Sequence, residues 1–204
     1  MNRKVIIPKG WEEYKLEDLT TRIRNGLTYD TSRRSGGPIA GSETISDGKI
    51  NVQKTGKINA NEVNYDYKII EGDILFSHIN SLKQIGKVAY FDDDIDLIHG
   101  MNLLLIRSNP QKINSKFLFY LLSSSTGKWI SYRLAKRAIN QASINTTELK
   151  KESVIIPPLP EQINIAKILS NWDEAIELVS KQIEAEKLLK KGLMQQLVKG
   201  IIRF

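Results

Sequence analysis

The sequence predicts a mixed α+β domain, rich in short strands, followed by one long C-terminal α-helix. Three observations lead to this fold class. Residues 1–156 alternate short apolar runs with turn signals and show no βαβ rhythm, residues 157–160 read Pro-Pro-Leu-Pro, and residues 161–199 contain no proline and carry apolar residues at heptad spacing. We therefore expect a domain over 1–156, a proline-rich junction over 157–160 and a helical segment over 161–204.

The composition is that of an ordinary folded protein with an excess of positive charge. The 204 residues are 41% hydrophobic and 26% charged, and the net charge is +7. Residues 161–204 carry only +1 of this charge, so the basic excess lies in the first part of the chain and favours a polyanionic partner. The chain has no cysteine, which excludes disulfides, thiolate catalysis and cysteine zinc sites, and fits the cytoplasmic location that we expect. No run of 18 apolar residues is present, so no membrane span is predicted.

Turn signals divide the first segment into short strands. Asp47-Gly48 is a two-residue hairpin signal between two apolar runs, and Glu71-Gly72-Asp73 precedes a third run. The expected strands lie at 39–45, 49–52, 74–76, 87–91, 103–107 and 154–156.

Helix signals follow in the second half of this segment. Ser115 is the expected cap of a helix that contains the apolar residues of 117–121, and a second helix is expected over 127–138. Asn145-Thr146-Thr147-Glu148 has the spacing of a capping box and predicts a third, brief helix.

The C-terminal segment predicts a helix that pairs with a second helix. Eight of its ten heptad seam positions are apolar, namely Ile165, Leu169, Trp172, Ile176, Val179, Ile183, Leu193 and Leu197. A helix over 161–199 would be roughly 58 Å long and could not bury this stripe alone, so its partner must come from another chain. Glu186 and Lys190 occupy the two polar seam positions, where they either fix the register or pair with each other at i,i+4. The junction starts this helix, since proline fits a first helical turn, although Pro157-x-x-Pro160 also has the spacing of a proline-rich ligand.

Signatures of catalysis are missing from the sequence. No phosphate-binding loop, dinucleotide-binding glycine motif or HExxH zinc motif is present, and His78 and His99 stand alone. The acidic run at 92–96 is typical of a solvated turn, and Glu13-Tyr14-Lys15 matches the end of a nuclease signature without its upstream acid. We therefore expect no catalytic residue, no metal site and no cofactor in this chain.

Basic and amide side chains instead predict contacts with double-stranded DNA. Arginine, asparagine and glutamine are the side chains that read base edges, and lysine is suited to phosphates. In the helix expected over 127–138, Trp129, Tyr132, Arg133 and Lys136 would share one stripe. For any single residue a solvated surface position is the alternative. The predicted contact residues are Arg22, Arg24, Arg33, Arg34, Lys54, Lys57, His78, Asn80, Arg133, Lys136, Asn140 and Gln141.

An ordered set of motifs resembles the specificity subunits of type I restriction-modification systems. The set consists of Pro8-x-Gly10-Trp11 with Lys15-Leu16-x-Asp18-Leu19, the GDILFS segment at 72–77, Ile156-Pro157-Pro158-Leu159-Pro160-Glu161-Gln162, Asn171-Trp172-Asp173, and the ending 188–197 with Arg203-Phe204. The resemblance spans the whole chain. It implies a target-recognition domain over 1–156 and a conserved helix over 161–204, in a non-catalytic subunit that directs methyltransferase subunits, and also ATP-driven restriction subunits, to DNA.

Members of this family typically carry two recognition domains and two long helices, whereas this chain has one of each. The resemblance thus implies a half-size subunit, with Met1 and the Arg203-Phe204 ending in favour of an intact product and a fragment of a longer protein as the alternative. A homodimer joined by an antiparallel intermolecular coiled coil would restore the two readers and recognise a bipartite site. Two other interpretations remain: a self-contained nuclease or methyltransferase, and a dimeric DNA-binding scaffold or regulator outside restriction-modification.

Overall fold

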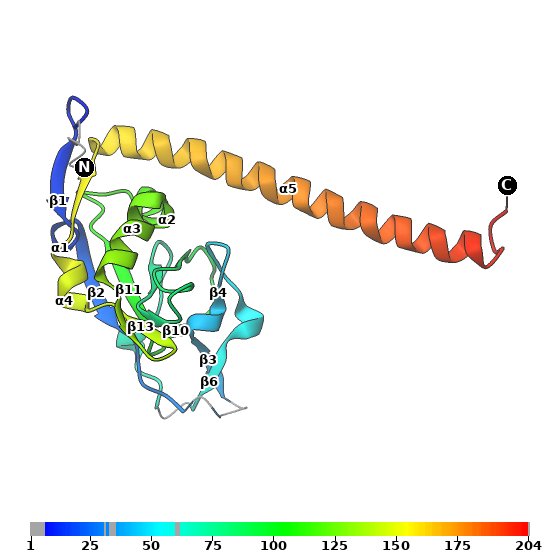
Figure 1. Ribbon diagram of the computed structural model, residues 1–204, viewed down its shortest axis with the longest axis horizontal. Helices are drawn as coiled ribbons and strands as arrows, with labels where there is room; N and C mark the ends of the chain where they lie inside the picture. The colour runs from blue at the N-terminus through cyan, green and yellow to red at the C-terminus, as the bar shows by residue number, and fades with distance from the viewer. Residues whose placement is uncertain (1–6, 31, 33–35, 60–61, 204) are drawn as a thin grey trace. The chain divides into compact units, whose positions relative to one another are not determined.

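A computed structural model describes residues 7–30, 32, 36–59 and 62–203 of the chain. It confirms the predicted α+β fold class, with many short strands and one long C-terminal helix (Figure 1). The chain forms two compact units, of which the first ends at Ile163 and the second begins at Asn164. The functional division at 156 and 161 stays a prediction.

The elements follow one another in a mixed order. The strands are β1 (Glu12–Lys15), β2 (Thr20–Asn25), β3 (Gly37–Ala40), β4 (Ile45–Ser46), β5 (Lys49–Ile50), β6 (Gly56–Ile58), β7 (Ile74–Ser77), β8 (Ile79–Asn80), β9 (Val88–Tyr90), β10 (Ile98–His99), β11 (Leu103–Ser108), β12 (Lys136–Ala138), β13 (Gln141–Ser143) and β14 (Ser153–Ile156). The α-helices are α1 (Leu16–Leu19), α2 (Ser115–Ser123), α3 (Ser125–Leu134), α4 (Thr146–Lys150) and α5 (Leu159–Val198), and the 3₁₀ turns are η1 (Ser42–Thr44), η2 (Val52–Lys54) and η4 (Tyr65–Tyr67).

A four-stranded antiparallel sheet in the order β2-β11-β7-β9 forms the centre of the first unit. All four residues of β7 and the first four of β11 are buried, so both faces of the sheet are covered at its middle. Leu75, Leu103 and Leu105 lie in one apolar cluster, and α2 contacts β9 and β11. Burial on both faces explains why these strands are continuous apolar runs instead of alternating ones.

Smaller sheets surround this centre. β1 pairs with β14 in antiparallel register, which brings the start of the described chain beside the strand that precedes α5. A second sheet has the order β10-β3-β6, and β4 pairs with β5. A third sheet has the order β12-β13-β8, so the β12–β13 hairpin is attached to the chain that follows the buried strand β7.

The predicted hairpin at Asp47-Gly48 is confirmed. Asp47 and Gly48 have φ values of 49° and 78°, as a two-residue hairpin turn between β4 and β5 requires. The strand predicted over 39–45 is wrong beyond Ala40, because the Gly41 amide donates to the Thr44 hydroxyl at 2.9 Å and the chain turns through η1. The run at 49–52 likewise ends at Ile50 and continues into η2. The four later strands are confirmed within two residues at either end.

Two helix predictions need correction. The cap of α2 is Asn114, one residue before the predicted Ser115, and its side-chain oxygen accepts from the Phe117 amide at 2.9 Å. The helix predicted over 127–138 is wrong in its last part, since α3 ends at Leu134 and 136–138 forms β12. Pairing with β13 gives the backbone N–H and C=O groups of 136–138 hydrogen-bond partners, whereas the last carbonyl groups of a helix have none within the helix. The brief helix capped by Asn145 is confirmed as α4.

Helix α5 contains 40 residues and is about 60 Å long at 1.5 Å per residue. Seven of the eight apolar seam residues are exposed, with Trp172 at 65% and Ile176 at 62%, and Ile165 is half-buried. The helix ion pairs Lys181–Glu177 and Lys187–Glu184 do not involve the polar seam residues. The seam of α5 is therefore open to a second helix, and the coiled coil with another chain stays a prediction. Within the described ranges, no helix combines the length and hydropathy that a bilayer crossing requires.

Candidate nucleic-acid interface

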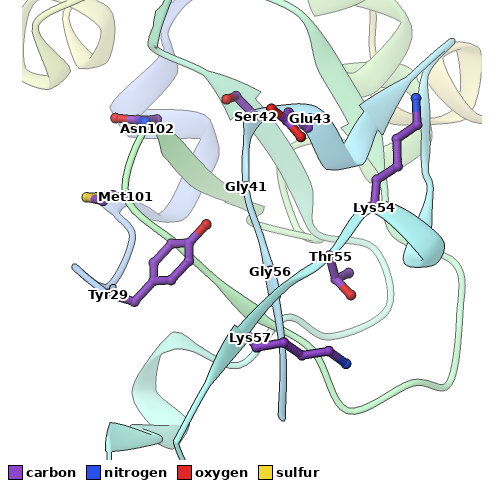
Figure 2. Close-up of a pocket in the computed structure, with 10 residues that line it drawn as sticks. All are labelled: Tyr29, Gly41, Ser42, Glu43, Lys54, Thr55, Gly56, Lys57, Met101 and Asn102. Carbon is purple, nitrogen blue, oxygen red and sulfur yellow. The ribbon is translucent and has the colours of Figure 1, made fainter. Parts of the chain in front are cut away.

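Two adjoining polar pockets lie on the first unit. The larger, of about 520 Å³, is lined by Tyr29, Gly41, Ser42, Glu43, Lys54, Thr55, Gly56, Lys57, Met101 and Asn102 (Figure 2). The smaller, of about 330 Å³, is lined by Ser42, Ile79, Asn80, Ser81, Asn102, Ile139, Asn140 and Gln141. Ser42 and Asn102 line both pockets, which makes the two a continuous surface.

Loops from several elements build the larger pocket. Lys54 ends η2 and Lys57 lies in β6, while Glu43 comes from η1, so the lining carries two cations and one carboxylate (Figure 2). Lys54 is exposed and Lys57 is half-buried. The pocket mouth is thus positive and fits an anionic ligand such as a phosphate.

Tyr29 forms one wall of this pocket and is fixed by close backbone approach. A Cβ atom on Gly100 would lie 2.5 Å from its ring, and a Cβ on Gly56 or Gly41 would lie 3.0 Å from the ring or the hydroxyl. Burial, and secondarily the charge of Glu43, raises the pKa of Tyr29. The phenol is therefore a neutral hydrogen-bonding group at physiological pH.

Amide and hydroxyl groups dominate the smaller pocket. The Asn80 amide donates to the Ser77 hydroxyl at 3.0 Å and its oxygen accepts from the Ser81 amide at 2.8 Å, so this side chain mainly shapes the loop. Asn140 and Gln141 come from the β12–β13 hairpin and are exposed. The pocket therefore brings together three predicted contact residues, Asn80 and, 60 positions later in the sequence, the adjacent Asn140 and Gln141.

Arg22 and Arg24 of β2 lie outside both linings. Both guanidiniums donate to the Asp66 carbonyl, at 3.1 and 3.3 Å, and Arg24 stacks 3.9 Å from the centre of the Tyr67 ring. These contacts hold η4 against β2. Both residues are half-buried.

The predicted stripe on 127–138 is divided between α3 and β12. Arg133 of α3 forms an ion pair with Glu152 and lies 4.7 Å from the Trp129 ring centre. Lys136 of β12 forms an ion pair with Glu148 at 2.9 Å. Both cations are exposed, but each is partly neutralised by its acidic neighbour.

His78 is 4% exposed, and its Nδ1 is buried without a hydrogen-bond partner among the described residues. Burial lowers its pKa. This placement at the end of β7 argues against the direct DNA contact that the sequence predicted. Arg33 and Arg34 lie outside the described residues.

The GDILFS segment supports the fold and does not line either pocket. Gly72 has a φ of +86°, and Asp73 is buried, where its two oxygens accept from the Arg107 guanidinium at 2.8 and 2.7 Å and from the Ile70 amide at 2.9 Å. Hydrogen bonding to Asp73 raises the pKa of Arg107. The motif thus fixes the turn into β7 and links it to β11.

The motif at the start of α5 is also explained by buried hydrogen bonds. Gln162 is 1% exposed; its oxygen accepts from the Asn114 amide at 2.9 Å, and its nitrogen donates to the Pro157 carbonyl at 2.8 Å. The Trp11 indole donates to Glu161 at 3.3 Å. The first turn of α5 is therefore an integral part of the first unit.

Sequence reasoning missed several lining residues. Tyr29, Ser42, Ser81 and Asn102 are not basic and lie in different loops, so no local pattern marks them. Asn102 carries one usable signal, a turn composition after Gly100, and its φ is 75°.

Comparison with known proteins identifies the family of the chain. A sequence model of the type I restriction modification DNA specificity domain matches residues 8–187. The chain belongs to this family. A putative type I restriction enzyme MjaX specificity subunit from Methanocaldococcus jannaschii is 48% identical over 200 residues, which cover 96% of this chain and 47% of the relative. The chain thus spans about half the length of the curated relatives it matches.

Solved structures of the family share the fold. The type I restriction-modification S subunit from M. genitalium matches with a TM-score of 0.66 at 18% identity, over 96% of this chain and 47% of that protein. A structure from work on complex assembly and conformational transition of the type I R-M system matches with a TM-score of 0.65 at 20% identity, over 96% and 47%. At these identities the likeness supports the fold.

Proposed function

We propose that this chain is a non-catalytic reader of DNA sequence in a type I restriction-modification system. The family match over 8–187 is the observation that carries this proposal. The two adjoining pockets support it, because they combine lysines with amide and hydroxyl groups on a chain of net charge +7. A role on DNA agrees with the cytoplasmic location expected from the absence of cysteine.

The pockets divide the contacts by chemistry. Lys54 and Lys57 bind phosphate oxygens at the larger pocket, and Asn140 and Gln141 reach base edges from the smaller one. Arg22, Arg24, Arg133 and Lys136 contribute positive charge around the duplex. The lysine contacts position the domain on any DNA, whereas the amides supply sequence preference.

A second copy of the chain provides the second reader. The exposed seam of α5 pairs with the same seam of its partner in an antiparallel coiled coil, which relates two recognition domains by a two-fold axis. Such a dimer reads two inverted half-sites separated by a fixed spacer.

Methyltransferase subunits dock on this dimer and carry the chemistry. They transfer a methyl group to adenine in their own pocket, after the base leaves the helical stack. ATP-driven restriction subunits join the same assembly. This chain selects the DNA sequence and sets the distance between the two half-sites.

Methylation mapping tests the proposal. The full chain is combined with its modification subunits and S-adenosylmethionine, and methylated adenines are located across a long DNA. We expect a bipartite, palindromic motif that is lost when the chain is omitted. Methylation without this chain, or methyl transfer by the purified chain alone, contradicts the proposal. Specific binding with no methylation by any modification subunit would instead identify a DNA-binding regulator.

A further inference from the structure

An almost fully exposed isoleucine belongs to the lining of the smaller pocket. Ile139 connects β12 to β13 and is 94% exposed, the largest value among the exposed large apolar side chains of the described residues. A single exposed apolar group needs no explanation by itself. Here, however, Ile139 belongs to the lining of a pocket whose other residues, apart from Ile79, are polar, namely Ser42, Asn80, Ser81, Asn102, Asn140 and Gln141.

The tip that carries Ile139 is held by a three-stranded sheet. β13 pairs on one side with β12 and on the other with β8, where Ala142 lies opposite Asn80. Ala142 is 1% exposed and anchors the hairpin to the domain. The tip therefore has a defined position relative to the pocket.

The two residues after Ile139 differ in their backbone. Asn140 has a φ of 62°, a left-handed conformation that asparagine tolerates better than most residues, so the turn accounts for its identity. Gln141 lies in β13, where extended backbone makes no such demand on the side chain, and its side chain is exposed and lines the pocket. We therefore take the Gln141 side-chain amide as a group that can reach a ligand.

An apolar group beside a side-chain amide matches one kind of base pair. In the major groove adenine offers the N7 acceptor and the N6 donor, which a glutamine amide binds as a pair, and thymine offers its C5 methyl group. A G·C pair offers no methyl group on either edge. The neighbouring strand β12 begins with the exposed cations Lys136, which is paired with Glu148, and Arg137. Positive charge beside the pocket suits the phosphates that flank a groove.

We propose that Ile139 is a specificity-determining residue that contacts the methyl group of a thymine in each half-site, while Gln141 binds the paired adenine. The proposal rests on the DNA-reading function proposed above and names the base pair that this pocket reads.

Base analogues test the proposal on the full chain bound to its mapped site. Each thymine is replaced in turn by deoxyuridine, which removes only the methyl group, and each adenine by 7-deazaadenine, which removes N7. At one A·T pair per half-site, we expect deoxyuridine to weaken binding by about threefold to fivefold, the effect of one methyl group leaving an apolar contact. Ile139→Ala binds the thymine and deoxyuridine duplexes equally. Gln141→Ala keeps the deoxyuridine effect but loses the 7-deazaadenine effect at the paired base.

Controls separate this inference from the proposed function. Ile70→Ala removes an isoleucine that is 46% exposed and outside both pocket linings, and it keeps the wild-type response to both analogues. If the wild-type chain shows no preference for any site, the DNA-reading function itself fails. If the wild type is specific but Ile139→Ala still responds to deoxyuridine, or no thymine responds at all, the inference is wrong and the function stands. Unchanged melting temperatures verify that the variants are folded.

Discussion

Asp73 accepts three hydrogen bonds although its side chain is fully buried. Arg107 donates two of them. Its side chain is one-quarter exposed, so the arginine of this ion pair reaches solvent whereas the aspartate does not. A buried carboxylate is tolerated because its oxygens are satisfied, and its removal takes this acceptor away from two groups, the Arg107 guanidinium and the Ile70 amide.

Asp73→Ala is therefore expected to lower the free energy of unfolding by about 3 kcal/mol, because the Arg107 guanidinium and the Ile70 amide lose their partner. Urea titration followed by circular dichroism measures this change. Asp94→Ala, in an exposed acidic turn, is the matched control and should change stability little. Equal effects of the two substitutions would contradict the structural role of the motif.

The burial of His99 leads us to expect that the stability of the folded chain depends on pH. Its Nδ1 donates to the Tyr67 carbonyl at 2.8 Å, and its buried Nε2 has no hydrogen-bond partner among the described residues. Burial lowers its pKa, and the charge of Arg24 acts in the same direction. The unfolded chain titrates near 6.5, so below this pH it binds a proton that the folded chain excludes.

Stability is accordingly complete above about pH 6.5 and is lost as the pH falls from there toward the lower pKa of the folded state. His99→Asn keeps a donor for the Tyr67 carbonyl and has no titrating group. We expect a flatter dependence of the melting temperature on pH between 7 and 5 for this variant than for the wild type, as measured by thermal denaturation. Parallel curves would show that His99 does not contribute.

Lys57 lies in the larger pocket and is expected to bind a phosphate. Lys57→Ala should weaken binding to specific and unrelated duplexes by the same factor and reduce the slope of log K against log salt by about one. Fluorescence anisotropy at several salt concentrations measures both quantities. A change in sequence preference instead would mean that Lys57 reads a base.

At the scale of elements, the first turn of α5 depends on one amide. Gln162→Ala leaves the Asn114 amide and the Pro157 carbonyl without their buried partner, and we expect the free energy of unfolding to fall by about 2 kcal/mol. Gln195→Ala, an exposed glutamine of the same helix, is the control. A denaturation midpoint that is equal for both variants would exclude a supporting role for Gln162.

Local chemistry explains which elements could be predicted. Strands with both faces buried, such as β7 and β11, appear as apolar runs, and Asp47-Gly48 and Asn145 carry their own turn and cap signals. β12 was not predictable, because its residues are all exposed and its conformation is set by pairing with β13. Helix propensity over 127–138 is too weak to override that pairing.

The candidate site was predictable only in part for the same reason. Lys54, Lys57, Asn140 and Gln141 were identified by side-chain chemistry, and the structure places them in two adjoining pockets. Tyr29 and Asn102 reach the same surface through long-range packing, which leaves no periodic trace in the sequence. His78 shows the opposite error, a polar residue whose neighbours bury it.

At the scale of the whole molecule, the exposed seam of α5 predicts self-association. Ile176→Asp places a charge at a seam position that is 62% exposed, and we expect it to convert a dimer to a monomer in analytical ultracentrifugation. Leu178→Asp introduces the same charge at a position that is 67% exposed but off the seam, and it should leave the dimer intact. Dissociation by both variants, or a wild-type chain that is monomeric at high concentration, would contradict the dimer.

The residues whose hydrogen bonds fix the turn into β7 and the first turn of α5 line neither pocket. Asp73, Arg107 and Gln162 are fixed by one another and by backbone groups, whereas Lys54 and Gln141 extend from the surface. Replacing the surface set leaves the internal set untouched. A descendant of such a protein can therefore acquire a new target sequence by a few outward-facing substitutions that leave these buried hydrogen bonds in place.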